Sequence, residues 1–274
     1  RLGVPLDRID VIEGDTAMVP TGTGTFGSRS IAVGGYAIDK AIERIIAKSK
    51  RIAAHMLEAS DGDIDFSDSV FNVAGTDRTL SFEEVAYSAL VPHNFPHEEL
   101  EPGLDETSVY DPPNFAFSNG THVCEIEIDR DTGAVELIGY WVVDDVGTVI
   151  NPMVVEGQIH GGLAQGIGQA LSEICQYDSV SGQILTGSFM DYAMPRASDL
   201  LDFVSELDES QPCTHNPLGA KGCGESGTIG APAAVIGAIL HALAPLGIHD
   251  LEMPATASRV WCAMRDAGRA DTLP

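Results

Sequence analysis

One carboxylate, Glu225, lies in a glycine-rich segment that reads Asn-Pro-Leu-Gly-Ala-Lys-Gly-Cys-Gly-Glu-Ser-Gly over residues 216–227. Glycines let a backbone approach a ligand closely, and a carboxylate with few charged neighbours can act as a general base. A structural role is also open, because Glu225 could cap the helix that the following residues predict. Ser226 is not a candidate nucleophile, since the Gly-x-Ser-x-Gly pattern is not satisfied around it.

A second glycine-rich segment, Thr-Gly-Thr-Gly-Thr-Phe-Gly-Ser-Arg-Ser at residues 21–30, stands directly before a helical pattern. Free N–H groups at the start of a helix attract anions, and Arg29 adds a fork of donors that matches a phosphate. No Gly-Lys-[Ser/Thr] ending makes it a P-loop, and the spacing does not suit a dinucleotide fingerprint. A flexible turn that precedes a helix remains an equally good interpretation.

The third glycine-rich segment follows Asn151-Pro152 and places five glycines within residues 157–168 of an otherwise helical pattern. Each glycine costs about 1 kcal/mol relative to alanine inside a helix, which indicates close approach by another helix or by a ligand. Gln158 and Gln165 are seven residues apart and share one helical face, where their amides could bind a heterocycle. His160 is better interpreted as an ordinary hydrogen-bonded histidine than as a ligand.

Composition limits the classes of protein to which the chain can belong. Its 274 residues are 44% hydrophobic and 20% charged, which is typical of a globular protein. The net charge of −26 argues against nucleic-acid binding and against an anionic membrane surface, both of which need clustered basic residues. An acidic, solubilising surface is the favoured interpretation, and a docking face for a basic partner is the alternative. No apolar run reaches the roughly 18 residues of a membrane span.

The five cysteines, Cys124, Cys175, Cys213, Cys223 and Cys262, include no CxxC pair. No zinc or iron–sulfur site is therefore predicted in this chain, and reduced thiols in a cytoplasmic protein are expected. If the protein transfers electrons, the relay centres are expected on other polypeptides.

The hydrophobic patterns predict an α+β fold. A strand is expected at Ile9–Ile12, and a connection without regular structure at Pro92–Asn119. The other expected elements are a helix from Ile31 to Leu57, a hairpin of Ile64–Phe66 with Val70–Val73, a helix from Ser81 with Glu84 in a capping box, strands at His122–Ile128 and Val135–Val143, a helix at Val154–Ile174, a strand at Leu200–Leu207 and a helix at Ala231–Leu246 with Pro232 in its first turn.

Taken together, the three glycine-rich segments resemble those of the molybdenum hydroxylases, the family of xanthine dehydrogenase, aldehyde oxidase and the carbon monoxide dehydrogenase large subunit. The wording of residues 216–227 is closest to the carbon monoxide dehydrogenase-like branch. The resemblance implies the C-terminal molybdopterin-binding portion of such a subunit, with mixed sheets packed against long helices. It places a first part of the cofactor-binding region in residues 1–120 and a second part in residues 121–274.

The resemblance also implies the cofactor and the residues that contact it. The cofactor is molybdenum held by molybdopterin, in its cytosine dinucleotide form in many bacteria, and the chain itself need not ligate the metal. The residues implied to line the pterin and its phosphates are Thr25, Phe26, Gly27, Ser28, Arg29, Ser30, Gln158 and Gln165. The backbone of Lys221, Gly222, Cys223 and Gly224 would lie near the metal.

The activity implied is oxidation of an aldehyde, an N-heterocycle or carbon monoxide, with water as the oxygen source and Glu225 as the base. The expected partners are the remainder of the large subunit, an iron–sulfur subunit with 2Fe-2S clusters and an FAD subunit. The chain begins after the position where the family has a further glutamine-containing motif, so we expect a fragment or a split subunit that is inactive alone. The alternatives are a remnant that binds a partner without molybdenum and, less favoured, a nucleotide-binding protein that uses residues 21–30.

Overall fold

The computed structural model describes residues 1–19 and 21–270, which form two compact units. The first unit contains Arg1–Thr25 and Val33–Pro112, and the second contains Phe26–Ala32 together with the chain from Pro113 onwards. The short segment Phe26–Ala32 therefore packs with residues that are far away in sequence. The functional division of the chain at residue 120 stays a prediction.

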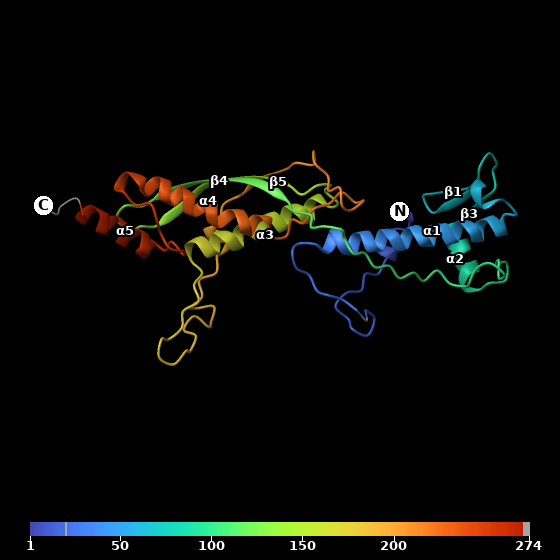
Figure 1. Cartoon of the computed structure of the whole chain (residues 1–274), viewed down its shortest axis with the longest axis horizontal. Coiled ribbons are helices and arrows are strands. Elements are labelled where there is room, and N and C mark those ends of the chain that lie inside the picture. Colours follow the sequence, from blue (N-terminus) through green and yellow to red (C-terminus); the bar gives the residue numbers. More distant parts are fainter. Residues whose placement is uncertain (20, 271–274) are drawn as a thin grey trace. The chain divides into compact units, whose positions relative to one another are not determined.

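The first unit is built on one long helix and a small antiparallel sheet (Figure 1). Its elements are the 3-10 turns Leu6–Arg8 and Asp61–Asp63, helix α1 (Tyr36–Met56), strands β1 (Ile64–Ser67), β2 (Val70–Val73) and β3 (Thr79–Ser81), and helix α2 (Phe82–Leu90). Ile52, Ile64, Phe71 and Val85 meet in its core and are almost completely buried. Burial of this apolar surface is the main force that holds the helices on the sheet.

The predicted helix from Ile31 to Leu57 is confirmed, with one local difference at its start. Its first residues, Ile31–Gly35, form a π-helical turn that leads directly into α1. Two glycines, Gly34 and Gly35, end that turn. Glycine has low helix propensity, so a widened turn competes more easily with regular α-helix there.

The predicted hairpin and the short capped helix of the first unit are also confirmed. Ser67 pairs with Val70 at the end of the hairpin, and Asp68 and Ser69 turn the chain with positive φ. The Ser81 hydroxyl accepts from the Glu84 N–H at 3.2 Å, and the Glu84 carboxylate accepts from the Ser81 N–H at 2.8 Å. The sequence did not predict β3, which has three residues and a single neighbour, β2.

Replacing Ser81 with alanine removes the acceptor that satisfies the first turn of α2. We expect the change to lower the free energy of unfolding by about 1 kcal/mol, a typical loss for an N-cap serine. Chemical denaturation measures the difference. Ser60→Ala is the matched control, because Ser60 precedes a 3-10 turn without capping it, and an equal loss in both variants would contradict the assignment.

The second unit contains a mixed three-stranded sheet covered by long helices, as the α+β prediction requires. Its elements are β4 (Asn119–Ile128), β5 (Val135–Asp145), α3 (Pro152–Leu171), the 3-10 turn Ala197–Asp199, β6 (Val204–Leu207), α4 (Ser226–Leu243), the 3-10 turn Ala244–Leu246 and α5 (Ala257–Ala270). β4 and β5 are antiparallel, whereas β6 runs parallel to β5. The predicted strand pair, the glycine-rich helix and the irregular connection between the units are confirmed.

Helices α3 and α4 lie side by side over the sheet (Figure 1). Ile159, Leu163, Val235 and Ile239 are completely buried in this layer, together with Tyr140 of the sheet. Glycines bring the two helix backbones together, because a Cβ at Gly227 would lie 2.5 Å from the Ile159 carbonyl oxygen and 2.6 Å from the Leu163 nitrogen. The core of this unit therefore depends on residues that have no side chain.

Three predicted elements differ from the structure. Ile9–Ile12 is not a strand, and its apolar side chains are exposed, because no described residues form a ladder with it. Leu200–Leu207 is a strand only from Val204, the first residue that pairs with β5. Helix α4 starts at Ser226, so Pro232 lies inside it rather than in its first turn. There Pro232 cannot donate to the carbonyl of the residue four positions earlier.

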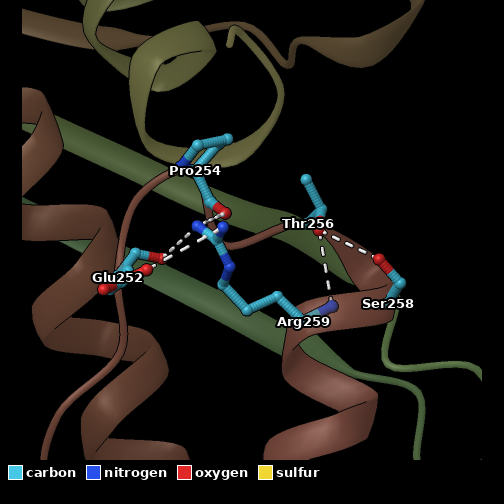
Figure 2. A network of polar contacts seen from close by, with 5 residues as sticks. All are labelled: Glu252, Pro254, Thr256, Ser258 and Arg259. Carbon is cyan, nitrogen blue, oxygen red and sulfur yellow. Dashed lines mark hydrogen bonds and ion pairs between the residues drawn. The ribbon is translucent and has the colours of Figure 1, made fainter. Parts of the chain in front are cut away.

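The sequence did not predict α5. Its residue Arg259 holds the loop that precedes this helix. Figure 2 shows the Arg259 guanidinium among the carbonyls of the preceding loop, where it donates to Glu252 at 3.1 Å and to Pro254 at 2.9 Å. The Thr256 hydroxyl accepts from the Arg259 N–H at 3.4 Å and also contacts Ser258. The planar fork of arginine suits this double contact, which joins the loop to the first turn of α5.

Among the described residues, Ser226–Leu246 is long and apolar enough to cross a membrane by length and composition. The prediction that no apolar run reaches the length of a membrane span is therefore wrong for this stretch, of which residues 231–246 were predicted to be helical. It packs against α3 and β4, and core helices pass the same test, so this property is weak support for a membrane span.

Candidate functional site

The Glu225 carboxylate is hydrogen-bonded to a residue almost two hundred positions earlier. The Ser28 hydroxyl donates to Glu225 Oε2 at 2.6 Å and accepts from the Glu225 N–H at 2.9 Å. Glu225 occupies the N-cap position of α4, but its side chain caps no helix N–H. The hypothesis that this side chain serves as a helix cap is therefore wrong, and the carboxylate stays exposed on the described chain.

Ser28 and the Glu225 turn fit together because glycine stands at position 222. A Cβ at Gly222 would overlap the Ser28 carbonyl oxygen and lie 2.7 Å from the Ser28 Cβ, closer than real contacts allow. Ser28 itself has φ +52°, a left-handed conformation that costs a residue with a side chain roughly 1 kcal/mol or more. Strain of this kind gathers at functional sites, where the surrounding structure holds it in place.

Helix α3 contributes Gln158 to the same place. A Cβ at Gly224 would lie 3.2 Å from Gln158 Oε1 and 3.4 Å from Ser28 Oγ. The structure thus brings residues from all three glycine-rich segments together. We call Ser28, Gln158, Gly222, Gly224 and Glu225 the Glu225 cluster. All five belong to the second unit.

The other residues predicted to line the cofactor are Thr25, Phe26, Gly27, Arg29, Ser30 and Gln165. Gln165 is exposed on α3, roughly 10 Å beyond Gln158 along the helix axis. The Arg29 guanidinium lies 4.0 Å from the centre of the Phe26 ring, a cation–π contact within the loop. Thr25 belongs to the first unit. Gly27 has φ +60°, and Ser30 begins the helical stretch; their predicted cofactor contacts stay predictions.

Lys221 and Cys223 use their side chains inside the fold. Lys221 Nζ lies 2.6 Å from Asp145 Oδ2, and both side chains are largely buried. The Cys223 thiol is half buried, and desolvation, together with the nearby Asp144 carboxylate, raises its pKa. It is therefore held as a neutral thiol at neutral pH. The predicted approach of the backbone of residues 221–224 to the metal stays a prediction.

Four of the five glycines of α3 divide into two groups, and the fifth, Gly168, packs against Pro195. Gly162 and Gly166 face α4, where a Cβ would meet Gly227, Thr228 or Ala231 at 2.7–3.1 Å. Gly157 and Gly161 are exposed, and a Cβ added at either position would have no neighbour within 4 Å. Close approach by another helix is therefore confirmed for Gly162 and Gly166, and approach by a ligand at Gly157 and Gly161 stays a prediction.

His160 is an ordinary hydrogen-bonded histidine, as predicted, because its Nε2 lies 3.1 Å from Ser205 Oγ. In residues 1–19 and 21–270, no group of three or more His, Cys, Asp or Glu side chains is arranged to hold a metal ion. All five cysteines are free thiols.

Beneath the Glu225 turn lies a buried polar group that the sequence analysis missed. It contains Asp144, His122 and Tyr140, and Ser226 Oγ donates to Asp144 Oδ2 at 3.0 Å. Two signals could have revealed it. Two aspartates end the apolar strand β5, and His122 shares the inward-facing alternation of β4 with Cys124.

Cys124 gives a pH-dependent test of this buried layer. Burial raises the pKa of Cys124 from 9.0 to about 11. A thiol whose pKa is higher in the folded state than in the unfolded state contributes full stability at pH values below its unfolded-state pKa. That contribution is lost as the pH rises through its folded-state pKa. We expect the free energy of unfolding to fall between about pH 9 and pH 11, and to fall less in Cys124→Val, as followed by denaturation at each pH. Identical slopes in the two proteins would contradict this.

Comparison with known proteins identifies the fold as that of a cofactor-binding domain. Residues 1–201 match the family model of the molybdopterin cofactor-binding domain, and the chain belongs to that family. The resemblance to the molybdenum hydroxylases stated from the three glycine-rich segments is confirmed.

The chain is 41% identical over 267 residues to the carbon monoxide dehydrogenase large chain of Hydrogenophaga pseudoflava, covering 97% of this chain and 33% of that one. The structure of reconstituted CO dehydrogenase from Oligotropha carboxidovorans matches with a TM-score of 0.89 and 38% identity, over 98% of this chain and 33% of the other. Quinoline 2-oxidoreductase from Pseudomonas putida 86 matches with a TM-score of 0.80 and 38% identity, over 89% of this chain and 31% of the other. The chain thus spans about a third of these relatives.

Proposed function

We propose that this chain is the part of the catalytic subunit of a molybdenum hydroxylase that carries its general base, Glu225. The observation that supports this most strongly is the hydrogen-bonded pair of Ser28 and Glu225, which joins two of the three glycine-rich segments. An exposed carboxylate held in one orientation is suited to proton transfer, because a base must be positioned before it can act.

The surface beside Glu225 fits a pterin cofactor. The exposed Gly157 and Gly161 leave the α3 backbone open to close approach, and the exposed Gln158 and Gln165 offer amides that can both donate and accept. The residues proposed to hold molybdopterin are Thr25, Phe26, Gly27, Ser28, Arg29, Ser30, Gln158, Gln165 and the backbone of 221–224. The separation of the two glutamines along α3 favours a long ligand, as the cytosine dinucleotide form is.

When bound, the molybdenum cofactor supplies two-electron oxidation of a substrate carbon with oxygen that comes from water. The role proposed for this chain's own residues is to accept a proton. Ser28 donates to Glu225 Oε2, so uptake of a proton is expected at the other carboxylate oxygen, Oε1. Gln158 and the backbone near Gly224 would hold the ligand against that oxygen.

The substrate is proposed to be carbon monoxide, an aldehyde or an N-heterocycle, since relatives named for carbon monoxide and for quinoline match almost equally well. The proposed partners are the remainder of a large subunit, an iron–sulfur subunit with 2Fe-2S clusters and an FAD subunit, in the cytoplasm. The net charge of −26 favours partners with basic contact surfaces.

The test is cofactor analysis of the complex isolated with its partner chains. We expect molybdenum and a pterin dinucleotide in near-equal amounts with this chain, together with oxidation of one of the three substrate classes. A stable complex that contains neither molybdenum nor pterin would instead identify an inactive remnant that only binds its partners.

A further inference from the structure

Two consecutive aspartates at the end of β5 hold the two ends of the turn that carries Glu225. Successive side chains of a strand point to opposite faces. Asp145 Oδ2 lies 2.6 Å from Lys221 Nζ at the start of the turn, and Asp144 Oδ2 accepts from Ser226 Oγ at 3.0 Å at its end. The Lys221–Ser226 turn is therefore tied at both ends to one strand.

The Asp144 side chain is only 1% exposed, and its second oxygen is incompletely satisfied. Oδ1 has no hydrogen-bond partner among the described residues, and His122 Nε2 lies 3.7 Å from it. A buried carboxylate is costly unless charge or hydrogen bonds compensate it. The buried Asp144 carboxylate therefore destabilises the fold, and such destabilising groups are typically retained at functional sites.

Two glycines on different elements make space for the Asp144 and His122 side chains. A Cβ at Gly120 of β4 would overlap Asp144 Oδ1, and a Cβ at Gly230 of α4 would lie 2.5–2.7 Å from the His122 imidazole. The other ring nitrogen, His122 Nδ1, lies 2.8 Å from the Tyr140 hydroxyl. Tyr140 therefore holds one side of the imidazole, and the other ring nitrogen, Nε2, faces Asp144 Oδ1 at 3.7 Å.

Ser226 connects this buried pair to the catalytic turn. Its hydroxyl has one proton and two acceptors, Asp144 Oδ2 and the Cys223 carbonyl oxygen, each at 3.0 Å. A carboxylate is the stronger acceptor, so Asp144 directs the hydroxyl. Ser226 also follows Glu225 directly, and the Glu225 N–H is the group that meets Ser28 Oγ at 2.9 Å.

We propose that Asp144 is a positioning residue that fixes the Glu225 turn through the Ser226 hydroxyl. This inference rests on the proposed function of Glu225 as a base. Asp144 does not touch the reacting atoms. It fixes the backbone from which the Glu225 carboxylate extends, so its loss is expected to slow the chemical step and leave ligand binding largely intact.

The test compares Ser226→Ala, Ser226→Thr and Asp144→Asn in the complete enzyme with its partner chains. Misplacement of a catalytic group by about 1 Å can cost roughly 100-fold. We therefore expect Ser226→Ala and Asp144→Asn to lower kcat by about 10- to 100-fold, with KM and molybdenum content within about twofold of wild type. Ser226→Thr keeps the hydroxyl and should recover most of the rate. Asp202→Asn, which changes an exposed carboxylate near β6, is the matched control.

A second readout does not depend on activity. Amide hydrogen exchange across residues 222–228 should become faster in Ser226→Ala and Asp144→Asn and stay unchanged in Asp202→Asn. Wild-type kcat in the first two variants, or unchanged exchange, would overturn the proposal. So would a Ser226→Thr enzyme that keeps the wild-type Tm and is as slow as Ser226→Ala. Wild-type enzyme without molybdenum would overturn the proposed function instead, and exchange would still decide whether Asp144 holds the turn.

Discussion

Glu225→Gln is expected to lower turnover of the complete enzyme by about 10²- to 10⁴-fold, the usual contribution of a general base. Glutamine has nearly the same shape and can still accept from the Ser28 hydroxyl, which lies 2.6 Å from Glu225 Oε2. It cannot take up a proton at the working pH. Binding of molybdenum and pterin should therefore remain. The rate at which substrate reduces the bound cofactor in a single turnover should fall by the same factor as kcat.

The matched control for this substitution is Glu206→Gln, which removes one exposed carboxylate from β6 in the same unit. It should keep wild-type turnover and cofactor content. If Glu225→Gln retained full turnover with full molybdenum, the assignment of the base would be wrong. If it lost molybdenum as well as turnover, Glu225 would be a cofactor-binding residue rather than a base.

Gly227→Ala is expected to lower the free energy of unfolding by about 1–3 kcal/mol, as overpacked cores do. The new methyl group would meet the Ile159 carbonyl oxygen at 2.5 Å and the Leu163 nitrogen at 2.6 Å. Both are backbone atoms of α3, so relief requires the two helices to move apart. Because α3 carries Gln158 and α4 follows Glu225, the same change should also reduce cofactor content. Chemical denaturation and molybdenum analysis measure the two effects.

Gly237→Ala is the matched control on the same helix. Nothing lies within 4 Å of a Cβ at Gly237, and alanine is the better helix former by up to about 1 kcal/mol. That variant should be as stable as wild type or more stable. Equal destabilisation by the two substitutions would show that α3 and α4 are not held by close backbone contact at Gly227.

Local pattern predicted most elements because their causes are local. The capping box of Ser81 and Glu84, the turn at Asp68 and the alternation along His122–Ile128 each depend on residues a few positions apart. The wrong predictions concern elements whose conformation is decided by tertiary contacts. Ile9–Ile12 has the composition of a strand but no partner in the described residues, and the start of α4 depends on α3 packing rather than on Pro232.

The sequence by itself determined the family and the three segments from which a catalytic role is proposed. The glycine-rich wording around Glu225, Ser28 and Gln158 was sufficient to state the family, and the family match confirms it. Glycines inside a helix are informative because each one destabilises it relative to alanine, so a close contact at that position is needed to explain its presence.

Only the tertiary structure decided how the Glu225 carboxylate is held. Its partner is Ser28, 197 positions away, and the buried Asp144 beneath it is 82 positions from Ser226. No periodicity links such residues, because contacts at long separation depend on how the sheet and helices pack rather than on local conformation. The sequence therefore predicted Glu225 as the base, and the packing of α3, α4 and β5 decided which serine holds its carboxylate and which aspartate is proposed to hold its turn.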